Sequence, residues 1–151
     1  MSVTGTLAPL HKSLTVNCDV EHAFRVFTDE IATWWPTSSH SIGGDKVETV
    51  VFEGRVDGRV YERQADGTAG EWGRVLVWEP PYRLVLAFYP GREPSESTEV
   101  EVRFTPDGDR TLLELEHRGW EIRGEKAPDV RASYDSGWDV VLGHYTGSIS
   151  R

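Results

Sequence analysis

Hydrophobic and polar residues alternate along the second half of the chain. In the run TEVEVRFT, residues 98–105, Val100, Val102 and Phe104 would share one face of a strand, and the charged residues between them would share the other. A period of two is typical of a β-strand that buries one face and leaves the other in water. Phe104 is therefore predicted to point into the protein.

The next run, TLLELEHRGW at residues 111–120, repeats this pattern. It places Leu113, Leu115 and His117 on one face and leaves Glu114, Glu116 and Arg118 on the other. His117 should thus face the interior, where it would be partly desolvated and could titrate near neutrality or hold a polar group of a ligand. The alternative is a core histidine satisfied by a backbone or tyrosine partner.

Five further runs are rich in β-branched and aromatic residues, and turn dipeptides such as Asp57-Gly58, Asp66-Gly67 and Pro80-Pro81 separate several of them. We expect strands at 11–18, 48–55, 58–64, 71–79 and 82–89. Short links between consecutive strands impose antiparallel pairing, so the part from 48 to 120 predicts a six-strand meander. The strands at 72–78 and 82–89 are apolar on both faces, which leaves their orientation open.

Two helices are expected to bracket the meander. Asp19 is a suitable N-cap for the first, in which apolar residues recur at helical spacing until Pro36 ends it: Val20, Phe24, Phe27, Ile31 and Trp34 or Trp35. The second is predicted from about Asp129 to Tyr145, with an apolar stripe of Val130, Tyr134, Trp138, Val141 or Leu142, and Tyr145. A sheet with one wet face must bury the other, and the long last helix is the element able to cover it.

Composition narrows the class of protein. The chain has 151 residues, which suits one domain spanning residues 1–151 with a core at about 10–147. Its net charge of −9 argues against binding to nucleic acid or to an anionic membrane, and no apolar run is long enough for a membrane span. A single cysteine, Cys18, allows no internal disulfide, and the first residues show no signal peptide, so a cytoplasmic location is expected.

The motifs of metal and cofactor chemistry are missing from the sequence. The five histidines form no HxH or HExxH pair, and no nucleophile elbow, P-loop or dinucleotide fingerprint is found. We therefore expect neither a metal nor a cofactor.

Several stretches resemble the family of homologues of the heat-shock-protein-90 ATPase activator. They are RVDGRVYER, EWGRVLVWEPPYRLVLAFYP, EVEVRFTPDGDRTLLELEHRGW and the C-terminal SGWDVVLGHY. That family belongs to the START-like, helix-grip superfamily, which also includes polyketide cyclases. The resemblance implies an α+β fold in which a seven-stranded antiparallel sheet wraps around a long C-terminal helix, with an internal cavity for an apolar or amphipathic small molecule.

Six tryptophans bear on the existence of such a cavity. A buried tryptophan needs a partner for its N–H, so filling a core with six is unusual when leucine would serve. Trp34 and Trp35 are neighbours and cannot easily both point to the core. We expect one to extend the stripe of the first helix and the other to lie at a cavity mouth, beneath a lid formed by residues 37–45.

The candidate ligand-binding residues are mainly aromatic, with a few polar groups among them. They are Trp34, Trp35, Trp72, Arg74, Trp78, Phe88, Phe104, His117, Tyr134 and Trp138. If Arg74 faces inward with Trp72 and Trp78, it could anchor a ligand carboxylate; the alternative is an exposed arginine paired across strands. Glu62 and Arg63 are read as residues of a solvated face.

Three functions follow as hypotheses. The first is binding of a small hydrophobic or amphipathic molecule. The second is a cyclase- or hydratase-like enzyme that uses the same cavity, with His117, Arg74, Glu116 or Tyr134 as its acid or base. The third is a co-chaperone-like module with a protein partner, for which a large exposed docking patch would be expected. An exposed edge strand could also pair two copies into a homodimer.

Overall fold

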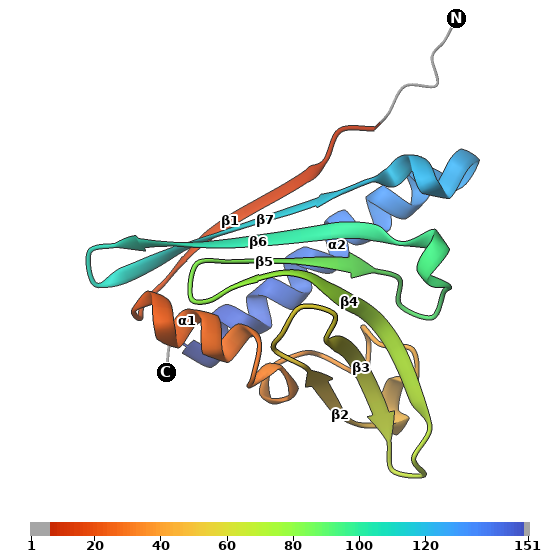
Figure 1. Cartoon of the computed structure of the whole chain (residues 1–151), viewed down its shortest axis with the longest axis horizontal. Helices are drawn as coiled ribbons and strands as arrows, with labels where there is room; N and C mark the ends of the chain where they lie inside the picture. Colours follow the sequence, from red (N-terminus) through yellow and green to blue (C-terminus); the bar gives the residue numbers. More distant parts are fainter. Residues whose placement is uncertain (1–6, 150–151) are drawn as a thin grey trace, which may run out of the picture.

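One antiparallel sheet dominates the computed structural model, which describes residues 7–149 (Figure 1). The sheet order is β1-β7-β6-β5-β4-β3-β2, so β2 to β7 form the predicted meander and β1 joins it beside β7. The strands are β1 Leu10–Val16, β2 Val47–Phe52, β3 Arg59–Gln64, β4 Ala69–Glu79, β5 Arg83–Phe88, β6 Thr98–Asp107 and β7 Arg110–Arg118. The ends of the expected domain, residues 1–6 and 150–151, lie outside the described residues.

The helix α2, Ala127–Ile149, runs across one face of the sheet (Figure 1). Its inward stripe is the one predicted: Val130, Tyr134, Trp138, Val141, Leu142 and Tyr145 all join the hydrophobic core or pack against it. The stretch before it, Trp120–Lys126, is a 3₁₀ segment that bends at Gly124, where φ is +58°. Within residues 7–149, no helix combines the length and the hydropathy needed to cross a membrane.

The first helix is shorter than its apolar stripe predicts. α1 covers Val20–Phe27, capped by Asp19 as expected, and a separate 3₁₀ turn covers Ile31–Thr33. At the end of the helix the Thr28 N–H and hydroxyl both donate to the Phe24 carbonyl, and the Glu30 N–H bonds to the Arg25 carbonyl, five residues back, in place of a further helical bond. The prediction of one continuous helix up to Pro36 was therefore wrong.

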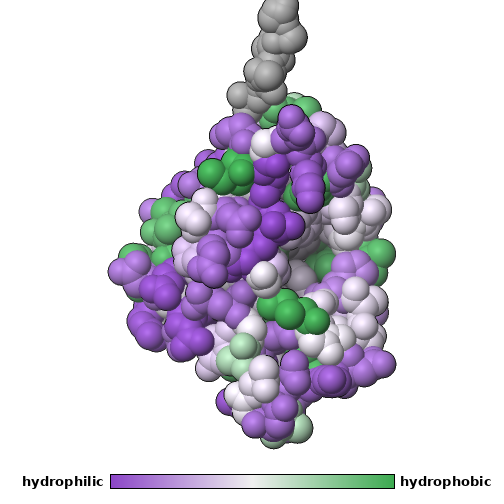
Figure 2. All heavy atoms as spheres, turned by 90° about the vertical axis from the view of Figure 1, so that its right-hand side faces the viewer, coloured by the Kyte–Doolittle hydropathy of each residue, from purple (hydrophilic) through white to green (hydrophobic). Residues whose placement is uncertain are grey.

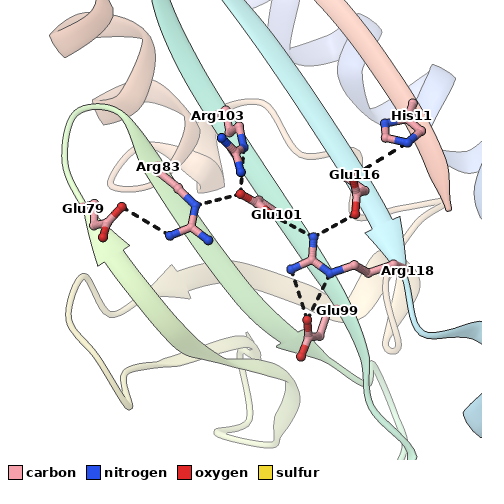
Figure 3. Close-up of polar contacts among 8 residues, drawn as sticks. All are labelled: His11, Glu79, Arg83, Glu99, Glu101, Arg103, Glu116 and Arg118. Atoms are coloured by element: carbon pink, nitrogen blue, oxygen red, sulfur yellow. Dashed lines mark hydrogen bonds and ion pairs between the residues drawn. The ribbon is translucent and has the colours of Figure 1, made fainter.

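The outer face of the sheet, opposite α2, carries a network of charges (Figure 3). The alternation of β6 places Glu101 on this face as predicted, but Glu101 is only 6% exposed. Its two carboxylate oxygens contact Arg83 at 2.7 Å, Arg103 at 2.8 Å and Arg118 at 2.7 Å. Burial alone would raise the pKa of Glu101, but hydrogen bonds from Arg83 and Arg118 outweigh it and lower the pKa to about 2.

Glu101→Gln is expected to destabilise the fold by up to about 3 kcal/mol at pH 7, because it removes the carboxylate that three guanidinium groups share. The lowered pKa means that this contribution is complete above about pH 4.5 and is lost as the pH falls toward about 2. Urea unfolding between pH 3 and pH 7 should show the gap between wild type and variant narrowing as the pH falls. Glu114→Gln, an exposed glutamate of β7, is the control; equal losses for both variants would contradict the prediction.

Candidate functional site

A cavity of about 820 Å³ lies between α2 and the sheet. Its wall is drawn from β4, the end of β5 and the residues after it, residues 39–42, the 3₁₀ segment before α2, and α2 itself. Figure 2 shows the molecule hollowed near the centre of the side that lies on the right in Figure 1, where the N-terminal end of α2 lies. The space therefore opens at the end of the helix opposite to the chain's C-terminus.

The apolar part of the wall is a continuous set of aromatic rings. Trp35 lies 4.8 Å from Trp72 and 6.0 Å from Trp138, measured between ring centroids. Phe88 lies 6.0 Å from Trp138 and 6.0 Å from Tyr134. These five rings come from four segments of the chain, so only the folded protein brings them together.

The two adjacent tryptophans divide between the core and the cavity wall. Trp34 is buried in the core, and its Nε1 donates to the Val26 carbonyl at 2.7 Å, which satisfies a carbonyl left free at the end of α1. Trp35 lines the cavity, and its Nε1 donates to the His40 carbonyl at 2.7 Å. The segment that follows Trp35 is thereby tied to the cavity wall.

Gly137 keeps part of the cavity open. It faces the space from α2, and a Cβ built on it would meet only His40, at 3.7 Å. A larger side chain here would extend into the cavity. Gly143, the next glycine of α2, has nothing within 4 Å of such a Cβ and does not line the cavity.

Five of the ten candidate residues line the cavity: Trp35, Trp72, Phe88, Tyr134 and Trp138. Trp34 and Phe104 belong to the core instead. Trp78 packs on Phe24 at 5.0 Å and on Phe52 at 5.9 Å, toward the α1 side of the sheet.

Arg74 faces outward, so its place among the residues expected to line the cavity was wrong. Its side chain is 45% exposed, as the alternative supposed, but its ion pair, at 3.6 Å, is with Glu71 of the same strand and not with a neighbouring strand. The cause is a β-bulge: Val60 pairs with Gly73 and Tyr61 with Glu71, which leaves Trp72 as an extra residue. The bulge reverses the alternation, so Trp72 and Arg74 point to opposite faces.

His117 faces inward as predicted, with 0% exposure, but it lies behind the wall and not in it. Its Nδ1 accepts the Trp138 Nε1–H at 3.0 Å, so Nε2 carries the ring proton and donates to the Thr98 hydroxyl at 2.7 Å. Burial, with the charge of Arg123, lowers the pKa of His117 to about 3. The imidazole is neutral near pH 7 and positions Trp138.

One end of the cavity is polar. Arg92, Arg123, Lys126 and Asp129 line it together with the hydroxyl-bearing Tyr134. Burial raises the pKa of Tyr134, whereas the charges of Arg123 and Arg92 act to lower it. The phenol is thus protonated at neutral pH and able to donate a hydrogen bond. Within residues 7–149, no group of three His, Cys, Asp or Glu side chains is arranged to hold a metal ion.

Sequence reasoning missed Glu62. It is 1% exposed, not part of a solvated face, and its carboxylate accepts the N–H groups of Ile42 and Gly43 and the indole Nε1–H of Trp72, each at 2.7 Å. The signal was present, because Val60 and Glu62 are two residues apart and strand alternation gives them the same face. Glu62 fastens residues 42 and 43 to the cavity wall.

Glu62→Gln is expected to destabilise the fold by about 2 kcal/mol, because an amide NH₂ would face N–H groups that now bond to carboxylate oxygens. Hydrogen exchange at the amides of Ile42 and Gly43 should accelerate more than exchange in β6 and β7. The control is Glu48→Gln, since the Glu48 side chain is 55% exposed. Unchanged protection of Ile42 and Gly43 would show that the carboxylate does not hold this segment.

Comparison with known proteins identifies relatives of the chain. The anthrahydroquino-γ-pyrone synthase Txn09, solved as a complex with SUM, is 35% identical, with 86% of this chain and 88% of that chain covered and a TM-score of 0.61. CalC from Micromonospora echinospora, a self-sacrificing resistance protein, is 27% identical, with 94% of each chain covered and a TM-score of 0.69.

The Aha1 dimer from Colwellia psychrerythraea shares the fold, with a TM-score of 0.68 over 95% of this chain and 96% of that chain at 14% identity. A search of curated proteins found no match. The family model described as "Activator of Hsp90 ATPase homolog 1-like protein" matches residues 17–144. With that match over most of its length and with the helix-grip fold, the chain belongs to the Activator of Hsp90 ATPase homolog 1-like family.

Proposed function

We propose that this protein binds a planar, largely aromatic small molecule in the cavity between α2 and the sheet. The observation that carries the proposal is the set of five rings that bound a space of about 820 Å³. Small-molecule sites are typically concave, mainly apolar and roughly 300–1,000 Å³ in volume. Aromatic walls favour flat ligands, because offset stacking and edge-to-face contact need ring faces on both partners.

The relatives support a polycyclic ligand. Txn09 is named as a synthase of an anthrahydroquino-γ-pyrone, a fused aromatic ring system. In proposing binding, we extend to this chain only the fused aromatic ring system that the name of its relative gives. A co-chaperone role has weaker support, because the Aha1 dimer shares the fold at only 14% identity.

Gly137→Leu is expected to abolish binding of the neutral fluorescent probe N-phenyl-1-naphthylamine, because the leucine side chain would project into the cavity. Gly143→Leu, on the same helix, should bind the probe as the wild type does, since that position is exposed and outside the cavity wall. Both changes raise helix propensity, so neither should lower stability through the backbone. Fluorescence titration measures the two affinities, and equal binding by both variants would refute the cavity as the site.

A second candidate function is ring closure on such a ligand, favoured by the 35% identity to the γ-pyrone synthase and by the position of Tyr134. Its protonated phenol lies at the cationic end of the cavity, where it would donate a hydrogen bond to an oxyanion that forms during cyclisation. In this role Tyr134 is a catalytic residue and the aromatic wall orients the substrate.

Tyr134→Phe should lower turnover about 100-fold while leaving the affinity for N-phenyl-1-naphthylamine within about twofold of the wild-type value, because only the hydroxyl is removed. The assay follows an anthrahydroquinone with an open side chain that can close to a γ-pyrone, with product detected by chromatography and mass spectrometry. Wild-type turnover that survives in Tyr134→Phe would remove Tyr134 from the mechanism. Binding without turnover would leave the protein a carrier.

A further inference from the structure

Positive charge is concentrated at one end of the cavity in a protein of net charge −9. Arg92, Arg123 and Lys126 line this end, and Asp129 is the one carboxylate among the lining residues. The cations come from two segments: Arg92 follows β5, whereas Arg123 and Lys126 belong to the 3₁₀ segment before α2. Folding therefore brings them together at the same place as the Tyr134 hydroxyl.

Among these three cations, Arg123 is the one with a buried donor that has no partner within residues 7–149. Its Nε donates to the Glu96 carbonyl at 3.1 Å, whereas its Nη2 is buried and has no hydrogen-bond partner within residues 7–149. A buried donor without a partner is costly, and buried charged groups are normally paired. Burial and the neighbouring charge of Arg92 lower the pKa of Arg123, which means that the protein around it does not compensate its charge fully.

The nearby carboxylates do not pair with the positive charge of Arg123. The Glu96 side chain pairs with Arg92 at 3.3 Å and offers Arg123 only its backbone oxygen. Within the part of the chain that the structure describes, no carboxylate lies within salt-bridge distance of Arg123. On the outer face of the sheet, by contrast, Arg118 meets three glutamates: Glu99, Glu101 and Glu116.

We propose that the ligand is a planar aromatic acid, whose anionic oxygen group lies beside the guanidinium of Arg123, Arg92, Lys126 and the Tyr134 hydroxyl. This inference rests on the proposed binding function and names the class of its ligand. The anionic group is a carboxylate or the ionised oxygen of an acidic phenol or enol. The fused rings of the molecule lie along Trp35, Trp72, Phe88 and Trp138, which fixes its direction in the cavity.

Two probes with the same ring system test the charge separately from the rings. 8-Anilinonaphthalene-1-sulfonate carries an anionic group, and N-phenyl-1-naphthylamine is its uncharged counterpart. In Arg123→Gln, affinity for the sulfonate should fall about tenfold because attraction to a partly buried positive charge is lost, while affinity for the neutral probe should stay within about twofold. Lys126→Gln should give a smaller fall, about two- to threefold, again for the sulfonate only, because that side chain is exposed and screened by solvent.

Arg74→Gln is the matched control, since it makes the same change of net charge on the opposite face of the sheet and should leave both probes unaffected. Lys126→Gln keeps the test valid if Arg123→Gln fails to fold, because Lys126 is exposed. If the two cavity variants lower the affinity for neither probe, or lower both affinities by the same factor, the proposal of an acidic ligand is refuted while the binding function stands. If the wild-type protein binds neither probe, the proposed function itself is refuted.

Discussion

The hydrogen bond from the Trp138 indole to His117 fixes the position of α2 against the sheet, and the cavity depends on that position. It joins the middle of α2 to β7 at 3.0 Å, in a place where both side chains are buried. Further along the helix, the Tyr145 hydroxyl donates to the Ala23 carbonyl of α1 at 2.7 Å. Breaking either bond would leave a buried polar group unsatisfied. The C-terminal half of α2 is thereby held close, and the stretch before Trp138 lines the cavity.

The same hydrogen bond removes His117 from the list of candidate acids and bases. A protonated imidazole would have to donate from Nδ1, but Nδ1 is the atom that accepts the Trp138 N–H. Burial opposes the charge as well, which agrees with a pKa lowered to about 3. The features that make an inward histidine attractive in the sequence, burial and an aromatic environment, are those that keep it neutral here. Its role is to hold Trp138 in the wall.

Strand alternation predicted the fold and part of the site, and it failed where the ladder is irregular. The regular pairing of β6 with β7 preserved the period of two, so Phe104 and His117 were placed correctly on the inner face. In β4, the extra residue at the bulge turned Arg74 outward, and the local signal of this irregularity is Gly73, a glycine inside the strand beside the bulged Trp72. Alternation places Glu62 on the inner face with Val60, but the sequence does not show the tertiary hydrogen bonds that allow its burial, from two backbone N–H groups 20 and 19 residues away.

The buried charged groups of this protein are of two kinds: those that the fold pairs within itself, and one that it leaves without a full set of partners. Glu62 and Glu101 are each held by three or more donors, so the cost of burying them is compensated within the fold. Among residues 7–149, only two buried side-chain donors lack a partner, the indole of Trp120 and Nη2 of Arg123. Trp120 packs on His117 and Tyr134 behind the wall, whereas Arg123 lines the cavity itself. The positive charge of Arg123 is thus not paired within the described fold, and an anionic group on a flat ligand in the cavity is the chemistry that would neutralise it.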